Sequence, residues 1–217
     1  MRHHLAFLHT LASNVDVFQT LVSARRPDLA VRHEVMANAL AEARTDGVTA
    51  RLTERVQQTM VDLASTGASV VVCTCSTIGG AAEATETGGR FVAMRVDRPM
   101  ADRVVTLGSR VLVLAALAST FGPTRTLLED SARRAGRAIQ LEERLVEDAW
   151  EHFERGDRER YYDIIAGALT DDLSGFDAVV LAQASMAPAA DRCSDVRVPI
   201  LSSPRMGVDA ALEKLRR

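Results

Sequence analysis

The chain of 217 residues lacks several features that define whole classes of protein. Its 26 Lys and Arg are nearly balanced by 29 Asp and Glu, so a net charge of −3 offers no basic surface for nucleic acid. No run of about eighteen apolar residues is present to cross a membrane. There is also no secretory leader, which predicts a cytoplasmic protein. Three cysteines, an odd number, argue against a disulfide framework.

Motifs for metal and nucleotide binding are missing as well. The Cys73-x-Cys75 pair has no second Cys/His cluster at ligand spacing, so no zinc site is expected. The Gly79-Gly80 pair lacks the spacing of a dinucleotide-binding or Walker loop. We therefore expect neither a metal nor a cofactor.

What the chain does contain is a regular alternation of short apolar runs and helical segments, which predicts βαβ units with parallel sheets. Ser13 and Asn14 read as a polar loop, and the charged run from Glu142 to Arg160 as a solvated helical face. Strands are expected over residues 5–12, 28–35, 68–75, 90–97, 110–118, 138–141, 176–184 and 199–202. Helices are expected over residues 15–25, 49–65, 123–135, 145–168 with a break near Gly156, and 208–217, with another starting at Pro99.

Two stretches of the sequence are repeated at nearly the same offset. Leu8–Ser13 is similar to Leu114–Ser119, and Val71–Cys75 to Val179–Gln183. The repeat predicts two pseudo-symmetric α/β halves, each a flavodoxin- or Rossmann-like layered parallel sheet, with a cleft between them. We expect the first half to comprise residues 1–97 and 199–217, and the second residues 98–198. Cys75 and Gln183 are then equivalent positions.

The stretch Ala68–Gly80 is the most informative in the sequence. Its apolar run predicts a strand buried on both faces, and Cys75 comes just past the end of that strand. Ser76 and Thr77 follow as the start of a helix, whose amides favour a thiolate and can hold a substrate carboxylate. Chemistry in open α/β sheets concentrates at such strand ends. Cys75 is therefore the predicted base or nucleophile.

Other polar side chains occupy similar places after predicted strands. His9 ends the first strand, and its ordinary pKa would suit a second acid or base. The hydroxyls of Thr10, Ser76, Thr77, Ser119, Thr120 and Ser185 are candidates for carboxylate binding, although each can equally be a helix cap alone. Cys73 lies within the apolar run and is expected in the core, Cys193 at the surface, and His33 as a partly exposed structural residue.

These residues resemble the motifs of the aspartate/glutamate/hydantoin racemase superfamily. Cys75-Ser76-Thr77 is similar to that family's Cys-Asn-Thr, and Leu181–Met186 to its Leu-Gly-Cys-Ala-Gly-Met, with Gln183 in place of the second cysteine. The Ser119-Thr120 loop resembles the family's middle threonine loop. The resemblance implies two α/β domains, a cofactor-independent amino-acid racemase or isomerase, and a small carboxylate or amino-acid-like substrate.

Gln183 changes what that resemblance predicts for the reaction. A primary amide is neither an acid nor a base at neutral pH, although it can hydrogen-bond to a carboxylate or an enediolate. Two-base racemisation is then in question. A one-cysteine decarboxylase, a cis–trans isomerase or a non-catalytic small-carboxylate-binding protein stay open. A homodimer is expected, as for many small α/β enzymes.

Overall fold

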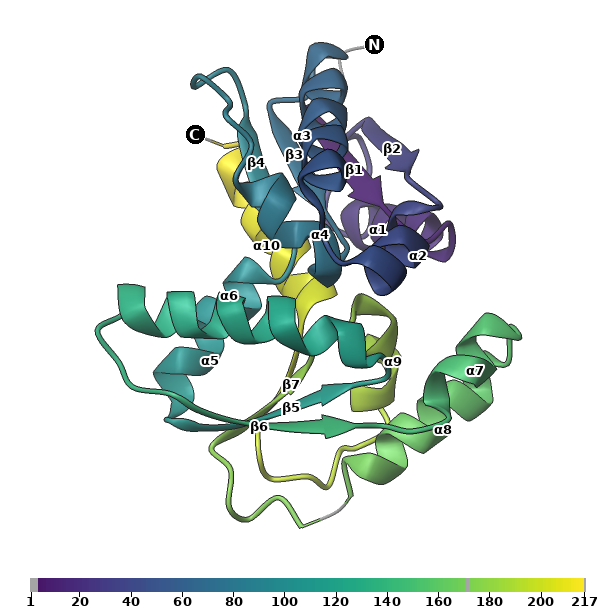
Figure 1. Ribbon diagram of the computed structural model, residues 1–217, viewed down its shortest axis with the longest axis vertical. Helices are drawn as coiled ribbons and strands as arrows, with labels where there is room; N and C mark the ends of the chain where they lie inside the picture. The colour runs from purple at the N-terminus through teal and green to yellow at the C-terminus, as the bar shows by residue number, and fades with distance from the viewer. Residues whose placement is uncertain (1–3, 171, 217) are drawn as a thin grey trace. The chain divides into compact units, whose positions relative to one another are not determined.

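The computed structural model describes residues 4–170 and 172–216, which fall into two compact units (Figure 1). Unit 1 consists of residues 1–99 together with 204–217, and unit 2 of residues 100–203. The chain therefore leaves unit 1, builds unit 2, and returns to unit 1 with its last helix.

Unit 1 is built on a four-stranded parallel sheet in the order β2-β1-β3-β4. Its two central strands are fully buried, as a sheet covered on both faces requires. The strands are β1 (Leu5–His9), β2 (Val31–Val35), β3 (Val70–Cys73) and β4 (Val92–Arg95). The helices are α1 (Ser13–Ser23), α2 (Ala39–Asp46), α3 (Ala50–Ser65), α4 (Ser76–Glu83) and α10 (Ser203–Lys214).

The two faces of this sheet carry different side chains because residues alternate along a strand. Leu8 and Cys73 point into a hydrophobic cluster with α3, whose Leu52, Val56, Met60 and Leu63 are all buried. Phe7 and His9 point the other way, towards Phe18 of α1. On this second face, His9 contacts Thr74, the residue immediately before Cys75.

Unit 2 repeats the same architecture with the sheet order β6-β5-β7-β8, again all parallel. Its strands are β5 (Arg110–Ala115), β6 (Gln140–Leu145), β7 (Ala178–Leu181) and β8 (Ile200–Ser202). Its helices are α5 (Arg98–Leu107), α6 (Phe121–Arg134), α7 (Ala149–Glu154), α8 (Arg158–Ala168) and α9 (Ala187–Ala190), with short 3-10 turns η1 (Ala118–Thr120) and η2 (Ala184–Met186).

The matching strand orders confirm the prediction of two α/β halves with parallel sheets. β1 and β5 take the same place in their sheets, as do β3 and β7, which are the strands that carry the sequence repeats. Cys75 precedes α4 with an extended backbone (φ −102°, ψ 119°), and Gln183 precedes η2 in nearly the same conformation (φ −122°, ψ 138°). The two residues are therefore topological equivalents, each in its own unit.

Some local predictions were wrong. Ser13 and Asn14 begin α1 instead of forming a loop, because β1 already ends at His9. Residues 140–145, predicted partly as a charged helical face, form strand β6. β6 is an edge strand with exposed residues on both faces, so its charged residues do not follow the alternating apolar pattern that predicts a strand. Helix α2 was not predicted, since it has few apolar residues.

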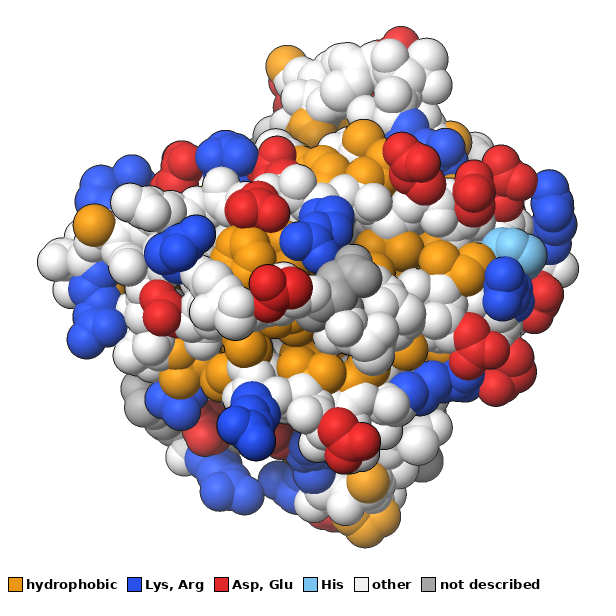
Figure 2. Space-filling model, turned by 90° about the horizontal axis from the view of Figure 1, so that it is seen from below, with side chains coloured by type: hydrophobic (Ala, Val, Ile, Leu, Met, Phe, Trp, Pro, Cys, Tyr) orange, Lys and Arg blue, Asp and Glu red, His pale blue; other side chains and the backbone are white. Residues whose placement is uncertain are grey.

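The surface carries mixed charge. On the face drawn in Figure 2, Lys and Arg side chains are interspersed with Asp and Glu and with small hydrophobic areas. Among the helices of residues 4–170 and 172–216, none combines the length and apolar character needed to cross a bilayer.

Candidate active site

Cys75 lies at the carboxyl end of β3, between the strand and α4. It takes the N-cap position of the helix, and its side chain makes no capping hydrogen bond. The thiol is partly exposed, whereas Ser76 and Thr77, the first residues of α4, are buried. The N-terminal turn of a helix presents backbone N–H groups and a positive dipole end, both of which stabilise an anion. This position suits a bound anion such as a carboxylate.

A buried ion pair holds the start of α4. Arg95, at the end of β4, donates through Nε and Nη2 to the two carboxylate oxygens of Asp97 at 2.7 and 3.0 Å. The same Nη2 donates to the carbonyl of Ser76 at 3.3 Å. Gly79 permits this approach, because a Cβ there would lie 3.1 Å from Nε of Arg95. The turn that carries Cys75 is thereby tied to the neighbouring strand.

The other two thiols are inaccessible. Cys73 is fully buried in β3, where burial raises the pKa of its thiol far above the ordinary value. Cys193, expected at the surface, is also buried, with Sγ 3.5 Å from the carbonyl oxygen of Ala189. Burial raises the pKa of Cys193 too. Cys75 is thus the one partly exposed thiol of the three cysteines in the chain.

His9 has a different environment from the one that its place at a strand end suggested. The residue is 0% exposed, and both ring nitrogens have partners: Nδ1 lies 2.8 Å from Thr74 Oγ1, and Nε2 lies 2.9 Å from Nδ1 of His33. Burial, with a smaller effect of His33, lowers the pKa of His9 to about 3. A ring so enclosed is not placed as a free acid or base.

In unit 2, Gln183 and Ser185 follow β7, and both make specific hydrogen bonds. The Oε1 atom of Gln183 accepts from the backbone N–H of Ala116 at 2.6 Å, which joins the ends of β7 and β5. The hydroxyl of Ser185 lies 2.8 Å from that of the buried Tyr161 on α8. Burial raises the pKa of Tyr161 well above its usual range, so its phenol stays protonated. The Gln183 loop is therefore fastened on two sides.

The remaining predicted hydroxyls lie where strand ends place them. Thr10 is buried just after β1, and Ser119 and Thr120 form the turn between β5 and α6. Two buried hydroxyl oxygens, Ser119 Oγ and Thr124 Oγ1, have no hydrogen-bond partner within the described residues. Buried polar atoms are normally paired, so these two can serve a bound polar group.

The predicted residues thus gather in two sets, one in each unit. In unit 1, His9 ends β1, Thr10 follows it, and Cys75, Ser76 and Thr77 follow the adjacent strand β3. In unit 2, Ser119 and Thr120 follow β5, and Gln183 and Ser185 follow the adjacent strand β7. Thr74 and Thr124 were not predicted, nor was the contact of His33 with His9. Thr74 stands beside Cys75 in sequence and was discoverable from its place, whereas His33 is brought in only by the pairing of β1 with β2.

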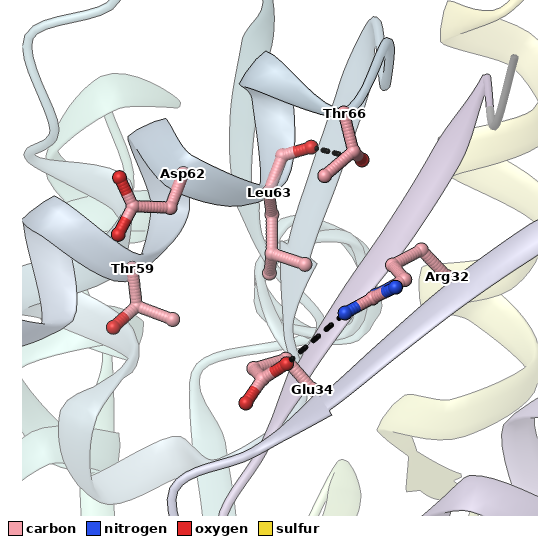
Figure 3. A pocket seen from close by; sticks show the side chains of 6 residues that line it. All are labelled: Arg32, Glu34, Thr59, Asp62, Leu63 and Thr66. Carbon is pink, nitrogen blue, oxygen red and sulfur yellow. Dashed lines mark hydrogen bonds and ion pairs between the residues drawn. The ribbon is translucent and has the colours of Figure 1, made fainter.

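Within the described part of the chain, no group of three His, Cys, Asp or Glu side chains is arranged to hold a metal ion. A separate polar hollow of about 310 Å³ lies between β2 and α3 (Figure 3). Arg32 and Glu34 of β2 point into it, 3.8 Å apart, opposite Asp62 of α3. His33 lies between them in sequence and points to the other face of the strand, so the hollow and the His9 environment are distinct.

Two α/β units, each with a parallel sheet, and a partly exposed cysteine at one strand end define a recognisable class of protein. The model of the Asp/Glu/hydantoin racemase family matches residues 8–211, and the chain belongs to this family. Membership supports a racemase-type enzyme of the isomerase class. No curated protein sequence matches the chain.

Solved structures agree on the fold at low sequence identity. A putative Asp/Glu racemase from Yersinia pestis is 14% identical with a TM-score of 0.68, over 98% of this chain and 99% of that one. Glutamate racemase isoform RacE1 from Bacillus anthracis is 14% identical with a TM-score of 0.65, over 98% and 81%. Allantoin racemase from Pseudomonas fluorescens is 15% identical with a TM-score of 0.63, over 100% and 91%.

Proposed function

We propose that this chain is a cofactor-independent enzyme in which Cys75 removes a proton next to the carboxylate or carbonyl of a small, amino-acid-like substrate. The observation that carries the proposal is the partly exposed thiol at the N-terminus of α4. The helix amides and dipole stabilise the thiolate, which is the form that acts as base.

The proton transfer has a simple balance. The Cys75 thiolate takes the proton from the carbon, and the electron pair of the broken C–H bond moves into the carbonyl group to give an enediolate or enolate. Preorganised donors stabilise that developing charge. We assign this role to the start of α4 with Ser76 and Thr77, and propose Thr10, Ser119, Thr120 and Ser185 as substrate-binding hydroxyls.

The single accessible thiol determines the stereochemical expectation. If Cys75 returns a proton to the face of the carbon from which it took one, the substrate exchanges hydrogen with retention of configuration. Inversion needs an acid on the opposite face. Gln183 occupies the topological position equivalent to Cys75 and cannot supply that proton. We therefore expect α-proton exchange to be faster than racemisation.

The first test is proton NMR in D2O with a panel of amino acids, hydantoins, malonates and maleate. The wild-type protein should cause loss of an α-proton signal, or a new product, and Cys75→Ala should abolish it. The matched Cys193→Ser variant, which alters a buried thiol away from α4, should keep the rate. Equal exchange by wild type and Cys75→Ala would contradict the proposal.

Two other functions use the same residues. Protonation of a decarboxylated enediolate, or addition of the thiolate to a double bond in cis–trans isomerisation, needs one cysteine only; the engaged amide of Gln183 favours this alternative. A non-catalytic small-carboxylate-binding protein would retain affinity in Cys75→Ala and show no turnover. Turnover of malonate or maleate in the panel would identify the decarboxylase or the cis–trans isomerase. Calorimetry on Cys75→Ala would identify the non-catalytic binding protein.

We further propose that the protein is cytoplasmic and forms a homodimer. Sedimentation velocity at two concentrations measures the oligomeric state directly, and a single species of one-chain mass would contradict the dimer.

A further inference from the structure

A continuous series of hydrogen bonds runs through the face of unit 1 that packs against α1. It begins at Thr74, immediately before Cys75, whose Oγ1 lies 2.8 Å from His9 Nδ1. His9 Nε2 lies 2.9 Å from His33 Nδ1, and His33 Nε2 lies 3.1 Å from Gln19 Oε1. Gln19 in turn donates from Nε2 to Ser23 at 2.9 Å. We call the hydrogen-bonded series Thr74, His9, His33 and Gln19 the Thr74 chain.

The orientation of the Gln19 amide in the structure sets the direction of every bond in the Thr74 chain when both histidines are neutral. Gln19 donates to Ser23 through Nε2, so its Oε1 accepts from Nε2–H of His33. His33 Nδ1 is then an acceptor, and His9 must donate to it from Nε2–H. His9 Nδ1 is left as an acceptor, and the hydroxyl of Thr74 donates to it.

The surroundings of the two rings favour this neutral state. Phe7 and Phe18 stack or tilt against His9 at centroid distances of 5.9 and 5.7 Å. The charged group that acts on the pair is Asp16 of α1, which partly offsets the lowering of the pKa of His33 by burial. Arg32 and Glu34, the charged neighbours of His33 on β2, point to the opposite face.

We infer that His9 and His33 are positioning residues for Cys75: the neutral pair orients the Thr74 hydroxyl and so fixes the turn between β3 and α4. Thr74 is anchored at both ends, since its backbone N–H donates to the carbonyl of Leu8 at 2.9 Å while its hydroxyl faces His9. The inference rests on the proposed function of Cys75 for its effect on catalysis, but not for its effect on the turn.

Uptake of one proton reverses part of the Thr74 chain. With an added proton on Nδ1, His33 becomes a donor at both nitrogens, so His9 Nε2 must accept and His9 Nδ1–H must donate to Thr74 Oγ1. The Thr74 hydroxyl then donates only to the carbonyl of Leu8, an acceptor that already lies 3.3 Å away in the structure. Acidification should therefore change the turn that carries Cys75 without unfolding the unit.

Nitrogen-15 NMR of the histidine rings tests the assignment without any substrate. At pH 8 both His9 and His33 should be the Nε2–H tautomer, and the pair should take up its first proton well below the ordinary histidine pKa. A Nδ1–H tautomer of either ring at pH 8, or independent titration of both near pH 6.5, would overturn the inference.

Matched variants separate positioning from mere packing. In His9→Asn, the amide retains a partner for Thr74. In His9→Gln, the amide retains only the link to His33. Thr74→Ser keeps the hydroxyl, and Thr74→Val removes it. We expect His9→Gln and Thr74→Val to slow alkylation of Cys75 by iodoacetamide about ten-fold at pH 7.5, and His9→Asn and Thr74→Ser to stay close to wild type. Peptide mapping assigns the label to Cys75.

The pH dependence supplies the second readout. Wild-type alkylation, corrected for thiolate formation, should fall in acid as the pair protonates, while His33→Asn, which keeps an acceptor towards His9 but does not titrate, should lack this fall. If all variants react and titrate like the wild type, the Thr74 chain does not position Cys75. If the alkylation pattern holds but no substrate exchanges, the inference stands and the proposed function fails.

Discussion

At the scale of single residues, Gln183 joins two strand ends of unit 2 by a hydrogen bond. Its Oε1 satisfies the N–H of Ala116 at the end of β5, a group that no cysteine side chain reaches in the same way. The side chain of Gln183 therefore carries a hydrogen bond inside unit 2. A thiol at this position should have a cost in stability.

We predict that Gln183→Cys lowers the free energy of unfolding of unit 2 by about 1–3 kcal/mol, because the buried N–H of Ala116 loses its acceptor. Gln140→Cys, the same exchange at an exposed position of β6 in unit 2, is the matched control. Trp150, the only tryptophan, lies in α7 of unit 2, so its fluorescence during urea titration reports on the right unit. An unchanged urea midpoint for Gln183→Cys would show that the hydrogen bond between Gln183 and Ala116 does not stabilise unit 2.

The place of Cys75 could be predicted from the sequence, since a short apolar run followed by small polar residues and glycines specifies a strand end. The environment of His9 could not. Whether a histidine at a strand end faces solvent or a second histidine depends on the register of β1 against β2, which pairs His9 with Val35 and Phe7 with His33. Local sequence contains no record of that register.

At the scale of elements, the start of α4 depends on a contact from the next strand. The Arg95–Asp97 pair is almost completely buried, with side-chain exposures of 4% and 2%. Removing one partner of such a pair leaves an isolated buried charge, which is far more costly than the loss of a surface pair.

We expect Arg95→Met to lower the free energy of unfolding by about 3–5 kcal/mol and to loosen the Cys75 turn. Arg55→Met is the control, because its pair with Glu42 across α3 and α2 is partly exposed and contributes only about 0–1 kcal/mol. Urea unfolding followed by circular dichroism measures both. Equal effects of the two variants would show that burial of the Arg95 pair has no energetic weight.

Elements differed in how well sequence specified them. Helix α3 was predicted closely, because its four apolar residues recur at helical spacing and all are buried. Strand β6 was mistaken in part for a helix, because an edge strand needs no apolar face and its charges fit either period. Strand ends were overextended generally, since apolar residues continue beyond the last sheet hydrogen bond.

At the scale of the whole molecule, the chain completes unit 1 only with its last helix. Gly207 of α10 packs directly on Val96, which follows β4: a Cβ at Gly207 would lie 2.3 Å from Val96 Cγ2 and 2.5 Å from its carbonyl oxygen. Contact with a backbone atom cannot be relieved by a rotamer change. The repeated sequence stretches predicted the two halves, but this contact is a property of the folded chain only.

Gly207→Ala should therefore destabilise unit 1 by about 1–3 kcal/mol, despite the better helix propensity of alanine. Gly167→Ala, in α8 with no atom within 4 Å of the added Cβ, should be neutral or stabilise by up to about 1 kcal/mol. Thermal and urea unfolding monitored by circular dichroism compare the two. A stable Gly207→Ala variant would mean that α10 has room to shift.

The return of the chain also sets an order of events during synthesis. The strands of unit 1 leave the ribosome first, yet the surface around Val96 stays uncovered until the segment from Pro204 has been made. Unit 2, whose residues are contiguous, has all its strands available earlier. During synthesis, unit 2 can therefore complete its fold before unit 1 can. The turn that bears Cys75 belongs to unit 1, which needs the C-terminal segment.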